Sequence, residues 1–211
     1  MMKIFNKSIS RIQFASELID NLKGDVVLDL GCRDQILKKH LKGNYNYIGI
    51  DYANLSNGNF IKHNLEEGLP NLDKKIDVIV CLDVLEHIDN SHKLRDEIFK
   101  TAQKKVIIAL PNMAYYKFRL NFLFKGELSG KYPFGEKKPA DRHKWITNIH
   151  NIKKFISTIN NDQWRIKEYD FIFERKRNFL MFNLEKILSK IFPSFFVYEK
   201  IIYFEKLNTK L

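Results

Sequence analysis

The chain has 211 residues, 45% of them hydrophobic and 29% charged, with a formal net charge of +11. This length suits one domain with a sizeable core, and the composition is that of a globular rather than a disordered chain. Two cysteines, Cys32 and Cys81, exclude a disulfide framework, and without a signal-peptide pattern or an apolar run of roughly 18 residues we expect a cytoplasmic protein.

The first half of the chain alternates helical segments with short apolar strands. Helices are predicted at residues 8–22, with Ser8 or Ser10 as the N-cap, and at 34–42 and 89–102. Strands are predicted at residues 26–30, 45–51, 60–64, 76–82 and 105–111. This alternation indicates βαβ units with right-handed crossovers and a parallel sheet.

The second half begins after Pro111 and has a different character. An aromatic helix is predicted at residues 113–125, followed by a loop-rich stretch at 126–145 and a helix at 148–160. Strands at 164–173 and 196–206, with a helix at about 178–190 between them, are expected to add an antiparallel pair at the sheet edge. The charge changes at the same point: residues 1–110 hold 16 Lys+Arg and 15 Asp+Glu, whereas residues 111–211 hold 20 and 10.

Several polar or glycine residues follow the predicted strands, at the edge where an open α/β sheet binds ligands. Asp29-Leu30-Gly31 closes the first strand, and Asp51 ends the second, 22 residues after Asp29. Asp51 is therefore placed to accept hydrogen bonds from both ribose hydroxyls of a nucleoside. A dinucleotide is disfavoured, because the loop after the first strand has one glycine instead of G-x-G-x-x-G and Asp34 would repel a pyrophosphate.

Three segments carry a resemblance to a known family: VVLDLGCRD, YIGIDYA and IDVIVCLDVLEHI. They are similar to the first, second-strand and fourth-strand motifs of the class I S-adenosylmethionine-dependent methyltransferases, over roughly residues 25–111. The resemblance implies that S-adenosyl-L-methionine is the cofactor. It also implies that the cofactor-binding residues are Asp29, Gly31 and Cys32, Asp51 and Tyr52, Asn64 and Leu65, and Leu82 and Asp83. The sequence departs from the family at Arg33 and Gln35, which stand where the family has glycines.

These features define an α/β, Rossmann-like, doubly wound seven-stranded sheet. We expect it to be mostly parallel with an antiparallel edge strand, and to carry a helical or loop lid after the fifth strand. The whole chain, 1–211, is predicted to be a single methyltransferase domain. Residues 1–111 form the cofactor-binding half, 112–147 the lid and acceptor region, and 148–211 the C-terminal helices and edge strands.

Two histidines are candidates for the general base that a hydroxyl acceptor would need. His87 belongs to the loop that leaves the fourth strand, and His143 lies in the lid. Their alternative roles are loop packing for His87 and a surface position for His143. No spacing of Cys, His and Asp predicts a metal site.

The segment from Pro111 to Leu128 also resembles the acceptor side of a methyltransferase subgroup that acts in glycan, lipopolysaccharide and methionine pathways. This weaker resemblance implies that Asn112, Tyr115, Tyr116 and Arg119 face the acceptor. The same helix places Met113, Tyr116, Leu120 and Leu123 at the spacing of a core-facing stripe, so only part of the helix can face the acceptor.

The basic second half predicts an anionic acceptor. A positive rim is expected from the following lid residues: Lys117, Arg119, Lys125, Lys131, Lys137, Lys138, Arg142 and Lys144. Residues 175–198 combine a basic start with strong apolar content, so they could rest on a membrane surface or pack as the last helix and strand, and packing is favoured.

The predicted function is S-adenosylmethionine-dependent O-methylation of a small-molecule or glycan-type acceptor, which could be phosphorylated or nucleotide-linked. The alternative is a methyltransferase-like adaptor of a biosynthetic pathway, suggested by Arg33 and Gln35. DNA is not expected as a partner. RNA methylation is less favoured, because no RNA-binding module or N-P-P-[FY] tetrad is recognisable.

Overall fold

A computed structural model describes residues 2–5, 10–19, 22–53, 60–128, 131–132, 142–159, 162–173 and 179–207. Its strands are β1 Met2–Phe5, β2 Leu22–Leu30, β3 Gly43–Asp51, β4 Phe60–Lys62, β5 Ile76–Leu82, β6 Ala102–Pro111, β7 Trp164–Phe173 and β8 Glu199–Lys206. Its α-helices are α1 Arg11–Leu18, α2 Ile36–His40, α3 Ser91–Thr101, α4 Tyr116–Lys125, α5 Ile149–Ser157, α6 Phe179–Ile191 and α7 Pro193–Phe196, and two 3-10 turns are η1 Leu65–Glu67 and η2 Leu85–His87.

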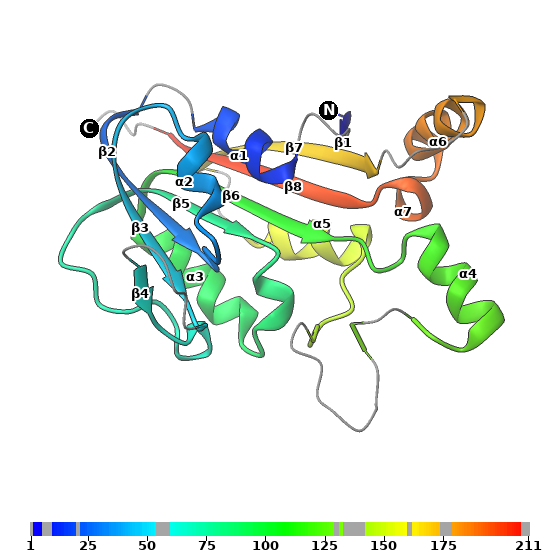
Figure 1. Cartoon of the computed structure of the whole chain (residues 1–211), viewed down its shortest axis with the longest axis horizontal. Coiled ribbons are helices and arrows are strands. Elements are labelled where there is room, and N and C mark those ends of the chain that lie inside the picture. The colour runs from blue at the N-terminus through cyan, green and yellow to red at the C-terminus, as the bar shows by residue number, and fades with distance from the viewer. Residues whose placement is uncertain are drawn as a thin grey trace.

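The strands form one sheet in the order β1-β7-β8-β6-β5-β2-β3-β4 (Figure 1). Strand β8 runs antiparallel to both β6 and β7, and the other pairs are parallel. The Rossmann-like α/β fold with an antiparallel pair toward one edge is therefore confirmed. The structure adds β1, which the sequence pattern did not indicate and which pairs with β7.

Both faces of the sheet are covered, because alternate residues along each strand enter different cores. Leu28, Ile79 and Ile108 belong to the core beneath α3 and α5, while Val78 and Ile107 belong to the core beneath α1 and α2. This two-sided burial explains why the central strands appear in the sequence as almost continuous apolar runs.

The boundary between the first helix and the following strand differs from the prediction. Helix α1 is shorter than predicted, since it begins after the cap Ser10, whose hydroxyl accepts from the Gln13 N–H at 3.1 Å, and ends at Leu18. Leu22, predicted as the last helical residue, opens strand β2 instead. Among the described residues, no helix has the length and apolar character needed to cross a bilayer.

Candidate functional site

Two carboxylates predicted from the sequence lie at the same edge of the sheet. Asp29 and Asp51 occupy the carboxyl ends of the neighbouring parallel strands β2 and β3, in which Leu30 pairs with Ile50. Both side chains are buried, and the negative charge of Asp51 raises the pKa of Asp29. The two carboxylates are therefore close enough to interact electrostatically. The geometry thus brings together the two carboxylates that the motif spacing pointed to.

The carboxylate of Asp51 organises the loop that follows β2. One of its oxygens accepts from the Arg33 N–H at 2.9 Å, and the other accepts from the Ala53 N–H at 2.8 Å. Each oxygen retains a second lone pair, because a carboxylate can accept about four hydrogen bonds. Asp51 is therefore held rigidly while keeping acceptor capacity for a ligand's hydroxyl groups.

Asp29 sits in a more apolar setting. Its carboxylate accepts a hydrogen bond of 2.6 Å from the Tyr47 hydroxyl. Burial is the main influence on this carboxyl and raises its pKa to about 7, against the lowering effect of the Tyr47 hydrogen bond and with a smaller raising effect from Asp51. A positively charged ligand group beside Asp29 would stabilise the ionised form that the buried site disfavours.

The loop between Asp29 and α2 keeps a left-handed backbone where the family's glycines are replaced. Gly31 has φ of 71°, and a Cβ there would approach the Cγ2 of Val84 to 2.6 Å. Arg33 and Gln35 also have positive φ, 41° and 54°. A non-glycine residue in the left-handed conformation costs roughly 1–2 kcal/mol. The loop therefore keeps the backbone conformation that glycines adopt easily, although Arg33 and Gln35 adopt it at a cost in free energy.

The remaining predicted cofactor residues lie around this edge with different surroundings. Cys32 is buried, with its sulfur 2.7 Å from where a Gly49 Cβ would stand, whereas Tyr52 is 73% exposed. The side-chain oxygen of Asn64 accepts from the Glu66 N–H at 3.2 Å and caps η1, in which Leu65 is buried. Both cysteines are free, as expected.

Asp83, after the half-buried Leu82 at the end of β5, belongs to a partly buried ionic cluster. Its carboxylate lies 2.8 Å from the Arg11 guanidinium, which is also 4.0 Å from Glu199 of β8. Burial raises the pKa of Asp83, outweighing the lowering effect of Arg11. Arg11 and Glu199 were not selected from the sequence, because neither lies in a recognisable motif.

The two candidate catalytic histidines are in direct contact. The rings of His87, in η2, and His143, in the lid, meet edge-on with centroids 4.6 Å apart and planes at 88°. The Nδ1 of His87 donates to the Arg142 carbonyl at 2.8 Å, since a carbonyl oxygen can only accept. Burial lowers the pKa of His87, and burial, with His87 and Lys131 nearby, lowers that of His143 to about 4.

Glu86 is the third member of this cluster, and it was not among the residues selected from the sequence. It is 1% exposed, and neither carboxylate oxygen has a hydrogen-bond partner among the described residues. Burial, followed by repulsion from Asp83, raises the pKa of Glu86 well above its usual value.

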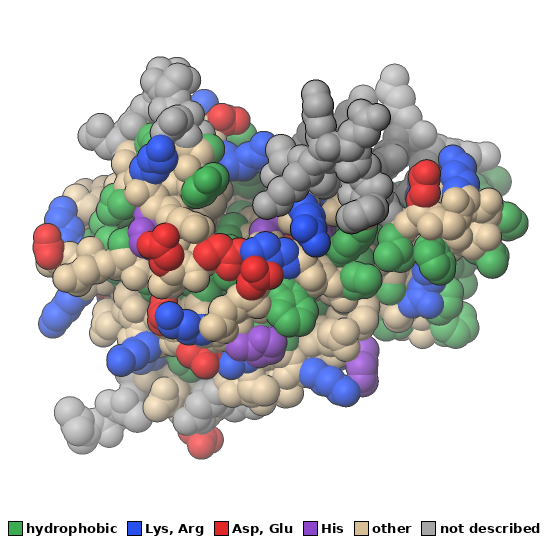
Figure 2. Space-filling model, turned by 90° about the horizontal axis from the view of Figure 1, so that it is seen from below, with side chains coloured by type: hydrophobic (Ala, Val, Ile, Leu, Met, Phe, Trp, Pro, Cys, Tyr) green, Lys and Arg blue, Asp and Glu red, His purple; other side chains and the backbone are tan. Residues whose placement is uncertain are grey.

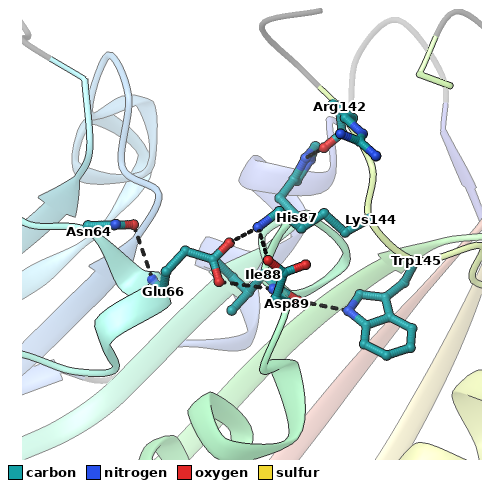
Figure 3. A network of polar contacts seen from close by, with 8 residues as sticks. All are labelled: Asn64, Glu66, His87, Ile88, Asp89, Arg142, Lys144 and Trp145. Atoms are coloured by element: carbon teal, nitrogen blue, oxygen red, sulfur yellow. Dashed lines mark hydrogen bonds and ion pairs between the residues drawn. The ribbon is translucent and has the colours of Figure 1, made fainter. Parts of the chain in front are cut away.

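The lid is fastened to the loop after β5 by a network of polar contacts (Figure 3). The backbone N–H groups of Lys144 and Trp145 both donate to the Glu86 carbonyl, at 2.9 and 3.2 Å. The Trp145 indole donates to the Ile88 carbonyl at 2.7 Å, and the Lys144 ammonium pairs with Asp89 at 2.7 Å and with Glu66. This network holds His143 against His87.

The predicted acceptor residues are placed mainly in contacts within the protein. Asn112 is fully buried, and its amide donates to the carbonyls of Ser194 and Val197 at 3.0 and 2.6 Å. Tyr115 is also buried and its hydroxyl donates to Glu185 of α6, while Tyr116 packs on the Phe196 ring at 5.3 Å.

Arg119 donates to the Ala114 carbonyl at 2.6 Å and lies 4.0 Å from the Phe195 ring centroid. These four predicted acceptor residues thus join α4 to α6 and α7. The core-facing stripe is wrong for Leu120 and Leu123, which are 46% and 71% exposed.

The predicted basic rim is partly neutralised where the structure describes it, because Lys144 already has two carboxylate partners. Lys137 and Lys138 lie outside the described residues.

Comparisons with known proteins agree with this geometry. A family model described as a methyltransferase domain matches residues 3–122. Ubiquinone biosynthesis O-methyltransferases from two strains of Rickettsia bellii, OSU 85-389 and RML369-C, are each 25% identical over 190 residues, covering 76% of this chain and 78% of the relative.

Solved structures share the fold at low identity. The small RNA methyltransferase HEN1 matches with a TM-score of 0.65 at 14% identity, covering all of this chain and 27% of HEN1. The plantazolicin methyltransferase BpumL, solved with SAH, matches with a TM-score of 0.56 at 12% identity over 92% of this chain and 81% of BpumL. Magnesium protoporphyrin IX methyltransferase from Synechocystis PCC 6803, solved with SAH, matches with a TM-score of 0.51 at 17% identity, over 92% of this chain and 83% of that methyltransferase.

The family match covers more than half of the chain and includes the strand ends that carry Asp29 and Asp51. The chain therefore belongs to the methyltransferase domain family, as a class I S-adenosylmethionine-dependent methyltransferase.

Proposed function

We propose that this protein transfers the methyl group of S-adenosylmethionine to an oxygen atom of a small-molecule or glycan-type acceptor. The observation that carries the proposal is the pair of buried carboxylates, Asp29 and Asp51, at the carboxyl ends of adjacent strands. Asp29 would pair with the ammonium of the methionine end, and Asp51 would accept the ribose hydroxyls. When bound, the cofactor supplies an activated methyl group on a sulfonium.

The residues present fit this cofactor. Asp51 is held by two backbone N–H groups with acceptor capacity to spare, and Asp29 is a buried carboxyl that has no ion pair with a cationic side chain among the described residues. The left-handed conformation of Arg33 and Gln35 preserves the loop path that glycines normally provide. This preservation favours a binding-competent enzyme over an adaptor that has lost the cofactor.

Titration calorimetry with S-adenosylmethionine and S-adenosylhomocysteine tests the proposal. Asp29→Asn and Asp51→Asn should each weaken binding at least tenfold, and the control Asp73→Asn, an exposed carboxylate outside this edge, should leave it unchanged. An absence of binding at millimolar cofactor in the wild-type protein would favour the adaptor. Methyl transfer from labelled cofactor to fractionated lysate, compared with transfer to RNA, then separates small or glycan-type acceptors from RNA.

The name of the Rickettsia relatives supports oxygen as the methylated atom. His87 is the candidate proton acceptor, because its Nδ1 donates to Arg142 and its Nε2 keeps a lone pair. His143, with a pKa of about 4, would be a weak base at neutral pH.

We also propose that the end of the molecule formed by α4, α6 and α7 rests on an anionic membrane surface. Helix α4 has no buried residue. The exposed large apolar residues of these helices are Leu120, Phe122, Leu123, Phe124, Leu180, Met181, Leu184, Ile187, Ile191 and Phe195. Helix α6 turns its polar residues Glu185 and Ser189 inward, so its outer face is mainly apolar, with the exposed Lys190 on it. Figure 2 shows hydrophobic side chains gathered at this end of the molecule, with basic side chains among them.

A lipid surface fits this end better than another protein because of its charge. The same helices carry Lys117, Arg119, Lys125, Lys186 and Lys190, which would face anionic headgroups. A hollow of about 320 Å³ between α4, α6 and α7 has mainly apolar walls, including Met181, Leu184 and Leu188. It would provide room for part of an acyl chain.

Co-sedimentation with vesicles tests this placement. The protein should bind vesicles of phosphatidylcholine and phosphatidylglycerol but not of phosphatidylcholine alone, and Leu123→Glu with Phe124→Glu should abolish the binding. Ile61→Glu, at an exposed apolar residue of β4, should not. A dimer in light scattering that the α4 variant dissociates, without vesicle binding, would identify the surface as a contact between two copies instead.

A further inference from the structure

We infer that Glu86, His87 and His143 form a binding site for a divalent first-row transition-metal ion. One ligand atom from each residue lies within 4.8 Å of the others. The site lies beside the proposed cofactor-binding residues. A role of the metal in methyl transfer rests on the proposed function, whereas metal binding itself needs neither cofactor nor acceptor.

Glu86 is the strongest indication of a ligand. Its side chain is buried, yet both carboxylate oxygens lack a hydrogen-bond partner among the described residues. Buried carboxylates are almost always paired, hydrogen-bonded or bound to a metal, because leaving them bare is costly. The Arg11 guanidinium, whose charge acts on Glu86, is engaged by Asp83 at 2.8 Å and lies 4.0 Å from Glu199, and it does not hydrogen-bond Glu86.

His87 is oriented as a metal ligand would be. Its Nδ1 is occupied by the hydrogen bond to the Arg142 carbonyl, so its Nε2 carries the lone pair, and that atom lies 4.0 Å from the Glu86 carboxylate. Metal-bound histidines commonly have their other nitrogen held by a carbonyl or carboxylate in this manner.

His143 completes the set from the lid. It is buried, and its Nδ1 has no hydrogen-bond partner among the residues that the structure describes. The backbone bonds from Lys144 and Trp145 to the Glu86 carbonyl keep this residue close to Glu86. The loop after β5 and the lid thus bring the Glu86 carboxylate and the His143 imidazole, both with unsatisfied polar atoms, close together.

The donor set indicates the class of ion. Two imidazole nitrogens and one carboxylate favour ions such as Zn²⁺, Co²⁺ or Mn²⁺ over the oxygen-seeking Ca²⁺. With metal–ligand bonds of about 2.0–2.2 Å, the ligand atoms need to approach one another by about 1.5 Å at most, which side-chain rotation can supply. Three protein ligands leave coordination positions for water or an acceptor oxygen.

This assignment uses the same His87 Nε2 that a general base would use. A metal ion bound there would exclude His87 as the proton acceptor and would itself polarise the acceptor hydroxyl. Metal binding and histidine base catalysis are therefore competing roles for this nitrogen.

Titration of the untagged, chelator-treated protein with Co²⁺, followed by its visible d–d absorption, tests the site without cofactor or acceptor. One equivalent should bind, and Glu86→Gln and His143→Asn should each weaken binding at least tenfold. The control His150→Asn, an exposed histidine of α5, should change it less than twofold. Calorimetry with Mn²⁺ and Zn²⁺ should give the same stoichiometry.

A second measurement on the wild-type protein guards against variants that fail to fold. Addition of Co²⁺ should raise its melting temperature, since an ion that binds the folded state stabilises it. No stoichiometric binding at millimolar Co²⁺, or binding that survives both substitutions in folded variants, would overturn the inference. Failure here with intact S-adenosylmethionine binding would leave the proposed methyl transfer standing.

Discussion

The Tyr47 hydroxyl donates a hydrogen bond of 2.6 Å to Asp29, a buried carboxyl whose pKa is raised to about 7. Tyr47 lies on β3 and Asp29 on β2, so the bond crosses between the two strands that carry the proposed cofactor site. We therefore expect cofactor binding at the proposed site to depend on pH through this carboxyl.

Cofactor affinity should rise with pH up to about 7 and then level off. Below pH 7 Asp29 holds a proton in the free protein, and an ammonium group would displace it, so affinity falls by up to about tenfold per pH unit. Calorimetry between about pH 5.5 and 8.5 measures this. Tyr47→Phe removes a hydrogen bond that favours the ionised form and should move the midpoint upward, while a flat wild-type profile would contradict the prediction.

The same carboxyl should make folding stability depend on pH. In the unfolded chain Asp29 has the ordinary aspartate pKa of 3.8, so between about pH 4 and 7 the folded state holds a proton that the unfolded chain has released. Its contribution to the free energy of unfolding is then present at low pH and lost as the pH rises to about 7. Urea denaturation of wild type and Asp29→Asn across this window should show a smaller pH slope in the variant.

Arg33→Gly should stabilise the protein. The substitution relieves a left-handed φ of 41° while keeping the backbone N–H that donates to Asp51. After the entropy cost of glycine, the free energy of unfolding should rise by up to about 1 kcal/mol, with a melting temperature about 2–4 °C higher. Lys39→Gly in α2 is the control and should destabilise; a loss of stability in both variants would refute the strain at Arg33.

Arg11→Met should destabilise more than loss of an exposed ion pair. It leaves Asp83 and the buried Glu199 without their guanidinium, for an expected loss of about 2–3 kcal/mol in the free energy of unfolding. Arg165→Met removes an exposed pair with Glu205 at 3.5 Å and should cost less than about 1 kcal/mol. Equal losses in urea denaturation would argue against a structural role for the Arg11 cluster.

Lys144→Ala should loosen the lid while scarcely changing stability. The chain has two tryptophans: Trp145 is 43% exposed beside Lys144, and Trp164, the first residue of β7, is buried in the core. In a Trp164→Phe background, acrylamide should quench Trp145 more strongly once the Lys144 pairs with Glu66 and Asp89 are lost. Lys153→Ala, on the exposed side of α5, is the matched control, and equal quenching in both variants would show that these pairs do not hold the lid.

Much of the fold could be predicted because its signals are local. The apolar runs of β2, β5 and β6 and the helical spacing of α3 and α5 identify elements from neighbouring residues, and βαβ connections admit few arrangements. Asp29 and Asp51 could be selected for the same reason, since each lies at the carboxyl end of a strand. Strand β1 escaped prediction because its four residues, Met2–Phe5, form a strand only by pairing with β7.

The acceptor side was predicted less well because its roles depend on contacts between distant segments. Asn112 and Tyr115 were expected to face a ligand, and in the structure they bind residues 70 or more positions away in α6 and around α7. Leu123 has the spacing of a core residue, but it lies 71% exposed on α4.

The sequence alone predicted the mostly parallel α/β sheet, the two carboxylates at the carboxyl ends of its strands, and the concentration of basic charge after Pro111. These features depend on consecutive residues, and so local patterns are enough to identify them. Tertiary structure alone brought His143 against His87 and Glu86, and exposed the apolar faces of α4 and α6. Residues 87 and 143 lie on separate segments, and only the packing of the lid onto the loop after β5 makes them neighbours.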